Sequence, residues 1–199
     1  MERKYAWHNY DDATIEKVYA LSDTYRQFLD NGKTERECVV QAVEFAEAKG
    51  YVNLNDIIKS NSSIKAGDKI YYTHMDKSIA LFNIGTDDIE LGMNILGAHI
   101  DSPRIDVKQN PQYEDSNLVF WDTHYYGGIK KYHWVAMPLA IHGVVVKTDG
   151  TRININIGDN ENDPVFCITD LLPHLGQEQM QKNAAKVIEG EAQIGRAHV

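Results

Sequence analysis

Two residues with metal-binding side chains, His99 and Asp101, follow an apolar run at residues 95–98 and precede Pro103. Successive side chains on a strand point to opposite faces, so residues two apart share a face. Proline cannot donate to a sheet ladder, so the strand should end here, where open α/β sheets bind ligands. Imidazole is a common zinc ligand, and a ligating histidine usually donates its other ring N–H to a carboxylate or carbonyl. The pattern therefore predicts that His99 binds zinc and that Asp101 supports it.

The tripeptide alone does not decide between this site and a structural role. Zinc needs three or four ligands, and His99 could equally be a hydrogen-bonded strand-end histidine with Asp101 capping a loop. Further motifs along the chain change the weight of the two alternatives. They are Thr-His-Tyr-Tyr-Gly-Gly-Ile-Lys-Lys-Tyr at 123–132, Leu-Ala-Ile-His-Gly-Val-Val at 139–145 and Ile-Thr-Asp-Leu-Leu-Pro-His-Leu at 168–175.

Together with Gly-Ala-His-Ile-Asp-Ser-Pro-Arg at 97–104, these motifs closely resemble the M18 family of metalloaminopeptidases, the aspartyl aminopeptidase group, and in particular its bacterial members. The resemblance extends from the first predicted helix to about Gly190. It implies a peptidase with two co-catalytic metal ions, usually zinc, that removes the N-terminal residue from peptides. The family's histidine ligand corresponds to His99, and the aspartate that supports the catalytic site corresponds to Asp101.

The resemblance also implies the fold class, an α/β mixed-sheet metallopeptidase catalytic domain with an inserted, mostly β dimerisation lobe. We expect residues 1–102 to be the amino-terminal part of an incomplete catalytic domain and residues 103–193 to be the lobe, itself incomplete. No segment matches the family's remaining metal ligands or its general base, so we expect the isolated chain to be inactive. Residues 194–199 back-translate to a common sequencing adapter, which predicts a non-native tail without function.

Two further histidines are candidates for contact with substrate or with a second subunit of a homo-oligomer. His124 lies in the 123–132 motif, and His142 precedes a glycine in the 139–145 motif. For both, the alternative is a strand histidine that is hydrogen-bonded inside its own lobe. His174 follows a proline and is predicted to pack or to cap a turn. The basic side chains near the motifs, which could meet an acidic substrate side chain or stay solvated, are Arg104, Lys130 and Lys131.

The rest of the sequence predicts the elements that position these motifs. Residues 12–29 predict a helix with an aspartate cap and one buried apolar stripe. A capping-box pair begins a second amphipathic helix at residues 34–49. The stripe of the first helix consists of Ile15, Val18, Tyr19, Ser22, Tyr25 and Leu29. Strands are predicted at 69–73 and 78–84, joined as a hairpin with His74 at its solvated turn, and at 118–124, 136–147 and 152–157.

The composition is that of an acidic globular chain, with a formal net charge of -9 and a pI near 5.3. Such a charge disfavours binding to nucleic acid and to anionic membranes. Cys38 and Cys167 fall in apolar surroundings and are predicted to be buried thiols. No apolar run approaches membrane-spanning length, and no signal-peptide core follows the charged amino terminus. We therefore expect a cytoplasmic protein that acts without a membrane or nucleic acid.

Two other classes of protein stay open at this point. A non-catalytic assembly module, in which a β lobe for self-association is attached to a degenerate scaffold, would form oligomers without zinc and would not depend on His99. Another co-catalytic metal hydrolase, such as a deacylase, would share the His-x-Asp strand, but the 123–132 motif counts against it. Our leading interpretation is a zinc aminopeptidase that acts on peptides with a free N-terminus.

Overall fold

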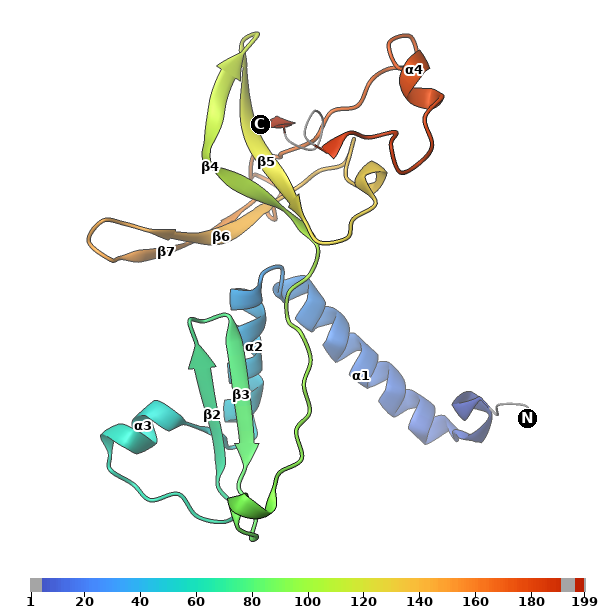
Figure 1. Cartoon of the computed structure of the whole chain (residues 1–199). Helices are drawn as coiled ribbons and strands as arrows, with labels where there is room; N and C mark the ends of the chain where they lie inside the picture. The colour runs from blue at the N-terminus through green and yellow to red at the C-terminus, as the bar shows by residue number, and fades with distance from the viewer. Residues whose placement is uncertain (1–4, 191–195, 199) are drawn as a thin grey trace. The chain divides into compact units, whose positions relative to one another are not determined.

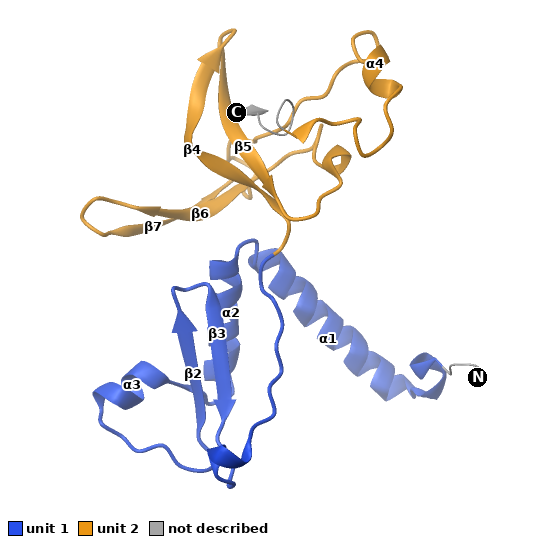
Figure 2. Cartoon of the chain, viewed as in Figure 1, with its two compact units in different colours: residues 1–101 blue, residues 102–199 orange. Residues whose placement is uncertain are grey.

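A computed structural model describes residues 5–190 and 196–198 of the chain. The chain divides into two units, residues 1–101 and residues 102–199, which Figure 2 draws in different colours. Both helices and strands are present, so the predicted mixed α/β class is confirmed. The assignment of the units to a catalytic domain and a dimerisation lobe stays a prediction.

The helices of unit 1 begin at the caps that the sequence predicts. A short helix, η1 (Ala6–Asn9), leads into α1 (Asp12–Asn31), where the Asp11 carboxylate accepts a hydrogen bond from the Thr14 N–H at 2.9 Å. In α2 (Glu35–Ala48) the Thr34 hydroxyl accepts from the Glu37 N–H, and the Glu37 carboxylate accepts from the Thr34 N–H. These bonds satisfy backbone donors that a helix start leaves open.

The expected burial of one stripe of α1 is wrong for the described chain. No residue of α1 is buried, and Tyr19 is 62% exposed. The helix is anchored near its carboxyl end, where the Phe28 and Phe45 rings stack and the Gln41 amide donates to the Phe28 carbonyl at 3.0 Å. Elsewhere the helix runs away from α2 within unit 1 (Figure 1). The predicted helix is therefore confirmed, but its apolar stripe is exposed or half-buried in the described residues.

The rest of unit 1 contains a small three-stranded sheet. Its strands β1 (Val52–Asn53), β2 (Lys69–His74) and β3 (Ser78–Asn83) lie in the order β1-β2-β3, with α3 (Leu54–Lys59) after β1. The predicted hairpin is confirmed, since β2 and β3 pair antiparallel. His74 is exposed at the end of β2, before a turn in which Met75 and Asp76 have positive φ.

The core of unit 1 lies between α2 and β2. It is formed by Cys38, Val39, Ala46, Ile70 and Tyr71. The Tyr71 hydroxyl donates to the Glu47 carboxylate at 2.7 Å and so ties the sheet to the helix. Burial, reinforced by the charges of two neighbouring glutamates, raises the pKa of the Cys38 thiol, as predicted for a structural cysteine.

The strand expected before Pro103 is absent. After η2 (Ile89–Leu91), residues 92–103 form no helix or strand, and Leu96 is fully exposed. A strand exists only where a neighbour supplies hydrogen bonds, and no strand of the described residues pairs with this segment. The prediction of a sheet strand carrying His99 and Asp101 is therefore wrong for this chain as it stands.

Unit 2 is mostly β, as predicted. The strands β4 (Arg104–Asp115), β5 (Leu118–Tyr126) and β8 (Arg196–His198) form one sheet, and β6 (Ile141–Val146) pairs with β7 (Arg152–Ile157) in the predicted hairpin. The strand β4 was not predicted. Short helices η3 (Lys131–His133) and α4 (Gln177–Met180) lie in the connections. The backbone of β8, which falls in the predicted non-native tail, pairs with residues 120–122 of β5.

The core of unit 2 is built around Ile168 and Ile188. Against them pack Ile105, Tyr125, Ile129, Trp134, Val135, Leu139 and Val187. Next to this core, a Cβ on Gly190 would lie 2.6 Å from the Tyr125 ring, so only glycine fits there. Cys167 is half-buried, which corrects the prediction that both cysteines are buried.

A turn held by Asp163 closes the end of β7. Its carboxylate accepts hydrogen bonds from the Gly158 N–H at 3.0 Å, the Asn160 N–H at 3.2 Å and the Asn160 side-chain amide at 3.0 Å. These donors favour the ionised form and lower the pKa of Asp163, with the Gly158 bond as the largest cause. The turn should therefore depend on the charge of this one side chain.

We expect Asp163→Asn to lower the thermal midpoint of the chain at pH 7. Because the pKa of Asp163 is lower in the folded state, its contribution is present above the unfolded value and is lost as pH falls through the folded one. The difference between variant and parent should narrow below about pH 4. Calorimetry across pH 2.5–7, chosen as roughly the carboxylate titration range, would measure this. Glu161→Gln, in the same turn, makes none of these bonds and serves as the control; equal effects of both variants would contradict the assignment.

Candidate metal centre

His99 and Asp101 lie in direct contact. The His99 Nδ1 is 2.8 Å from the Asp101 carbonyl oxygen and 3.3 Å from the Asp101 carboxylate. A carbonyl oxygen only accepts hydrogen bonds, so Nδ1 carries the proton in this contact and Nε2 holds the lone pair. A metal-ligating histidine has this arrangement, with one nitrogen fixed by an oxygen acceptor and the other directed to the metal. The side chains predicted to act together are therefore within bonding distance.

The contact arises locally, because the segment holding it is not part of a sheet. The two residues are only two positions apart, so the His99 ring can reach the Asp101 carbonyl and carboxylate without help from another element. The His99 side chain is 84% exposed. The His99–Asp101 pair is thus formed, but few residues pack around the His99 ring.

The pair could supply one ligand of a zinc site, His99 with its supporting Asp101, but not a complete site. Zinc takes four ligands in structural sites and three protein ligands in catalytic ones. Among residues 5–190 and 196–198, no group of three or more His, Cys, Asp or Glu side chains is close enough to hold a metal. The nitrogen chemistry of His99 suits zinc, and the remaining ligands would have to come from outside the described residues.

The other candidate histidines lie in unit 2. His124 is exposed on β5, opposite Asp106 on β4, and its ring stacks on Tyr125 with centroids 5.3 Å apart. His142 on β6 is 10% exposed, and its Nε2 lies 3.2 Å from the Asp159 carboxylate. His142 therefore has a carboxylate partner inside its own lobe, which is the alternative the sequence left open. Contact of either residue with a second subunit stays a prediction.

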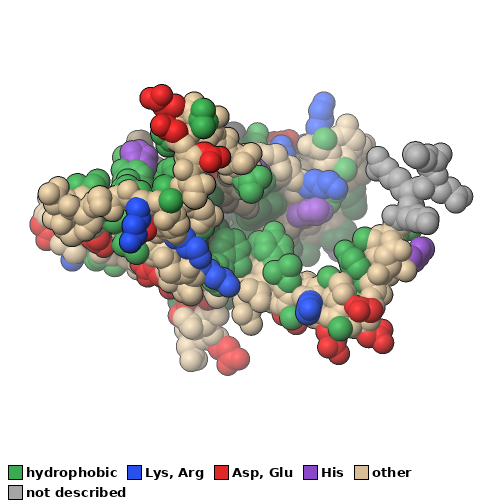
Figure 3. Space-filling model, turned by 90° about the horizontal axis from the view of Figure 1, so that it is seen from below, with side chains coloured by type: hydrophobic (Ala, Val, Ile, Leu, Met, Phe, Trp, Pro, Cys, Tyr) green, Lys and Arg blue, Asp and Glu red, His purple; other side chains and the backbone are tan. Residues whose placement is uncertain are grey.

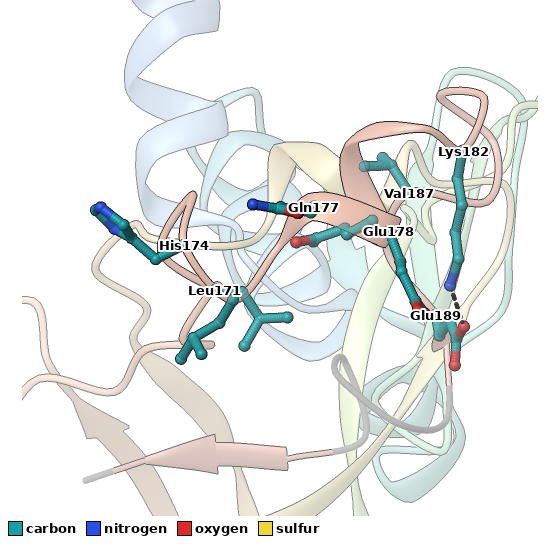
Figure 4. A pocket seen from close by; sticks show the side chains of 9 residues that line it. Leu171, His174, Gln177, Glu178, Lys182, Val187 and Glu189 are labelled. Atoms are coloured by element: carbon teal, nitrogen blue, oxygen red, sulfur yellow. Dashed lines mark hydrogen bonds and ion pairs between the residues drawn. The ribbon is translucent and has the colours of Figure 1, made fainter.

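A cavity of about 550 Å³ includes His174 (Figure 4). On its opposite side from His174, Lys182 donates to the Glu189 carboxylate at 2.7 Å. This hydrogen bond, followed by the charges of Lys182 and Lys131, lowers the pKa of Glu189. The other residues around the cavity are Leu171, Leu175, Gln177, Glu178, Gln179 and Val187. Sequence reasoning missed this ion pair, since nothing local marks residues seven apart outside a helix.

The basic side chains near the motifs have neighbours of their own. The Arg104 Nε donates to the Asp106 carboxylate at 2.7 Å, and its guanidinium lies 4.3 Å from the centre of the Tyr126 ring. The Lys131 ammonium lies 5.4 Å from the centre of the Tyr125 ring. Arg104 and Lys131 thus contribute to the packing of unit 2, and the structure gives no separate support for a role in substrate recognition.

Residues 28–195 match a family model of a class of zinc metalloproteases. Its description is "Aminopeptidase I zinc metalloprotease (M18)". The chain belongs to this family, M18. The resemblance inferred from the four motifs is confirmed, and zinc is the metal that the family's description carries. In the described residues, no helix is long and apolar enough to cross a membrane.

Relatives with the same family name cover nearly the whole chain. A Clostridium acetobutylicum protein named "Probable M18 family aminopeptidase 1" is 53% identical over 190 residues, which are 96% of this chain and 41% of that protein. A Thermotoga maritima protein of the same name is 47% identical over 182 residues, 89% of this chain and 38% of its own length. The chain therefore spans about two fifths of these relatives.

Solved structures of the family agree with the fold. The crystal structure of the Thermotoga maritima M18 aminopeptidase has a TM-score of 0.87 at 42% identity and covers 100% of this chain and 41% of its own. The aminopeptidase I of Clostridium acetobutylicum has a TM-score of 0.84 at 51% identity, covering 100% of this chain and 43% of its own. The roles of individual residues, His99 and Asp101 included, stay predictions.

Proposed function

We propose that this chain is part of a zinc-dependent aminopeptidase that hydrolyses the N-terminal residue from peptides. Membership of the M18 family supports the class, and the His99–Asp101 contact is the observation that connects this class to particular atoms. The relatives are named aminopeptidases, which supports peptides with a free N-terminus as substrates. The absence of a membrane-spanning helix in the described residues is compatible with action in the cytoplasm.

In this proposal His99 is a metal ligand and Asp101 is its support. The Asp101 oxygens hold the Nδ1–H of His99, so that the Nε2 lone pair is the one presented to the metal. His99, with ligands from outside the described residues, would hold a site of two zinc ions, which would supply an activated water and polarise the carbonyl of the bond to be cleaved. Unit 1 is then the first part of the catalytic domain, and unit 2 is an inserted lobe through which copies associate as a homo-oligomer.

The alternative function is a non-catalytic assembly module. One observation favours it: the described residues hold no cluster of three metal ligands. If this alternative is correct, the β-rich unit 2 associates without zinc, and His99 is a solvated residue. The two functions differ in whether metal and His99 matter when the remaining part of an M18 protein is present.

A chimeric protein tests the proposal. Residues 1–190 of this chain replace the matching region of the Clostridium acetobutylicum relative, whose sequence is 53% identical there. We expect the chimera to release N-terminal residues from short peptides, to lose this activity with a chelator, and to regain it with zinc. The 199-residue chain alone should show none. An inactive, folded chimera beside an active parent enzyme would favour the assembly module.

A further inference from the structure

The cavity that includes His174 and Glu178, the α4 cavity, is large enough for a small ligand or a side chain. Its volume of about 550 Å³ lies within the range of about 300–1,000 Å³ that is usual for ligand sites. Its apolar walls include Leu171 and Leu175, which are 49% and 75% exposed. An occupant with an aliphatic stem could therefore bury apolar surface that is now open to water.

One carboxylate of the α4 cavity is open to a partner. In Figure 4 the Glu178 side chain lies between His174 and the ion pair of Lys182 with Glu189. Among the described residues, no group donates a hydrogen bond to the Glu178 carboxylate. The Lys182 ammonium is already held by Glu189 at 2.7 Å. The charge left unpaired in the α4 cavity is therefore negative.

The Lys182–Glu189 pair shows which kind of group the α4 cavity accommodates. It consists of a carboxylate and an ammonium on an apolar four-carbon stem. Lysine buries such a stem along apolar surface while its charged head meets a polar group. The Gln179 amide donates to the Asp170 carboxylate at 2.8 Å, which leaves its carbonyl oxygen as a further acceptor. A second basic side chain would find apolar walls and oxygen acceptors together around Glu178.

Other classes of ligand fit the α4 cavity less well. Among residues 5–190 and 196–198, no three His, Cys, Asp or Glu side chains are close enough to hold a metal ion. An anion would meet Glu178 in a chain of formal net charge -9, whose acidic side chains lie at several places on the face drawn in Figure 3. Such a charge attracts cations to the surface and repels anions. The complementary occupant is therefore a cation with an apolar stem.

We propose that the α4 cavity binds a lysine or arginine side chain of a peptide. The Glu178 carboxylate pairs with the charge of that side chain, and Leu171 and Leu175 cover its stem. The proposal goes beyond the aminopeptidase function and does not depend on it, because the α4 cavity lies within unit 2 and contains neither His99 nor Asp101.

Titration of the 199-residue chain with Nα-acetyl-lysine amide, followed by nuclear magnetic resonance, tests the α4 cavity. A chelator is present throughout, so that the result is independent of any metal centre. We expect saturable shifts of the amide signals of residues 171–189, with a dissociation constant of about 1 mM. The arginine compound should bind similarly. The norleucine compound, which has the stem without the charge, should bind at least about tenfold more weakly. Equal binding of the norleucine compound, or no saturable shift, would overturn the proposal.

Two variants change the charge of the α4 cavity in opposite directions. Glu178→Gln, at an exposed position, should weaken binding of the lysine compound at least about tenfold. Lys182→Gln removes a competing cation and should strengthen binding by about two- to fivefold. Glu161→Gln, the same change as at Glu178 but in the turn after β7, is the matched control and should leave the affinity unchanged.

The outcomes that contradict the proposal are distinct from a loss of enzymatic activity. If Glu178→Gln binds the lysine compound as tightly as Glu161→Gln does, the Glu178 carboxylate is only solvated and the proposal fails. Affinity that does not rise with Lys182→Gln would contradict the charge argument. Signals of residues 171–189 that shift on dilution without any ligand would mean that a second copy of the chain covers the α4 cavity, which would also overturn the proposal.

Discussion

Replacing His99 with alanine in the chimera is expected to abolish peptide hydrolysis and to lower the zinc content of the purified protein. The reason is that the Nε2 of His99 is the lone-pair nitrogen left by the Nδ1 contact with Asp101. Loss of a group that only supports a ligand typically costs about 10–100-fold in metal affinity or activity, and loss of the ligand itself should cost more. Initial rates on a short peptide, together with zinc measured by atomic absorption, give both quantities.

Two variants set the scale for this loss. Asp101→Asn keeps the backbone carbonyl contact and removes only the carboxylate, so we expect a decrease of about 10–100-fold. His74→Ala removes an exposed histidine at the end of β2 and should change neither zinc content nor rate. If His99→Ala retains zinc and turnover like His74→Ala, His99 is not a ligand, and the assembly module becomes the better account.

Ile168→Ala is expected to destabilise the chain by about 2–5 kcal/mol, the usual range for a large aliphatic side chain removed from a core. Ile168 is 1% exposed and forms the centre of the unit 2 core with Ile188. Its carbonyl also accepts the Ala136 N–H at 2.8 Å, which fixes the backbone so that the cavity cannot close easily. Urea unfolding followed by tryptophan fluorescence would measure the loss, since Trp134 packs against this core.

The same chemical change on the β6–β7 hairpin provides the control. Ile153 on β7 is 38% exposed, so Ile153→Ala should cost less than about 1 kcal/mol. Comparable losses at the two positions would mean that Ile168 is not the centre of a packed core. A loss at Ile168 confined to the unfolding of unit 2 would in turn show that the two units unfold separately.

The sequence predicted most reliably the features that neighbouring residues decide. The caps at Asp11 and Thr34 and the β6–β7 turn are local, and the structure confirms each. The strand β4 was missed because one of its own residues argues against a strand. Pro111 lies inside it and usually argues against a strand, but it falls in a register shift between Val107 and Gln112, where a missing N–H is tolerated.

The turn after β4 also concealed the hairpin. Ser116 and Asn117 both have positive φ, the geometry of a two-residue hairpin turn. Such turns are normally recognised by a glycine, and here neither position holds one. The paired strands β4 and β5 thus depend on cross-strand contacts, such as the stacked rings of Tyr113 and Phe120, that sequence spacing does not reveal.

In the candidate site, too, the contact between close neighbours in sequence was predicted, and the contacts with distant residues were not. The expected contact between His99 and Asp101 is present, although the sheet strand from which it was predicted is absent. The Asp159 partner of His142 was missed, because the hairpin register puts Asn156 opposite His142 and Asp159 lies beyond the end of β7. The exposure of His99 was not predicted, because the sequence indicated a sheet strand and no strand of the described residues pairs with this segment.

The passage from unit 1 to unit 2 has a mechanical consequence. Unit 1 ends at Asp101 and β4 begins at Arg104, so only Ser102 and Pro103 lie between the candidate site and the first strand of unit 2. Extended chain spans about 3.3–3.6 Å per residue, which leaves this tether roughly 10 Å of reach. The ten residues before Ser102 carry no helix or strand either, so rotation of this irregular backbone can absorb movement at the connection. The His99–Asp101 contact therefore lies on the same irregular segment that connects the two units, and its geometry depends on that backbone alone and not on a sheet.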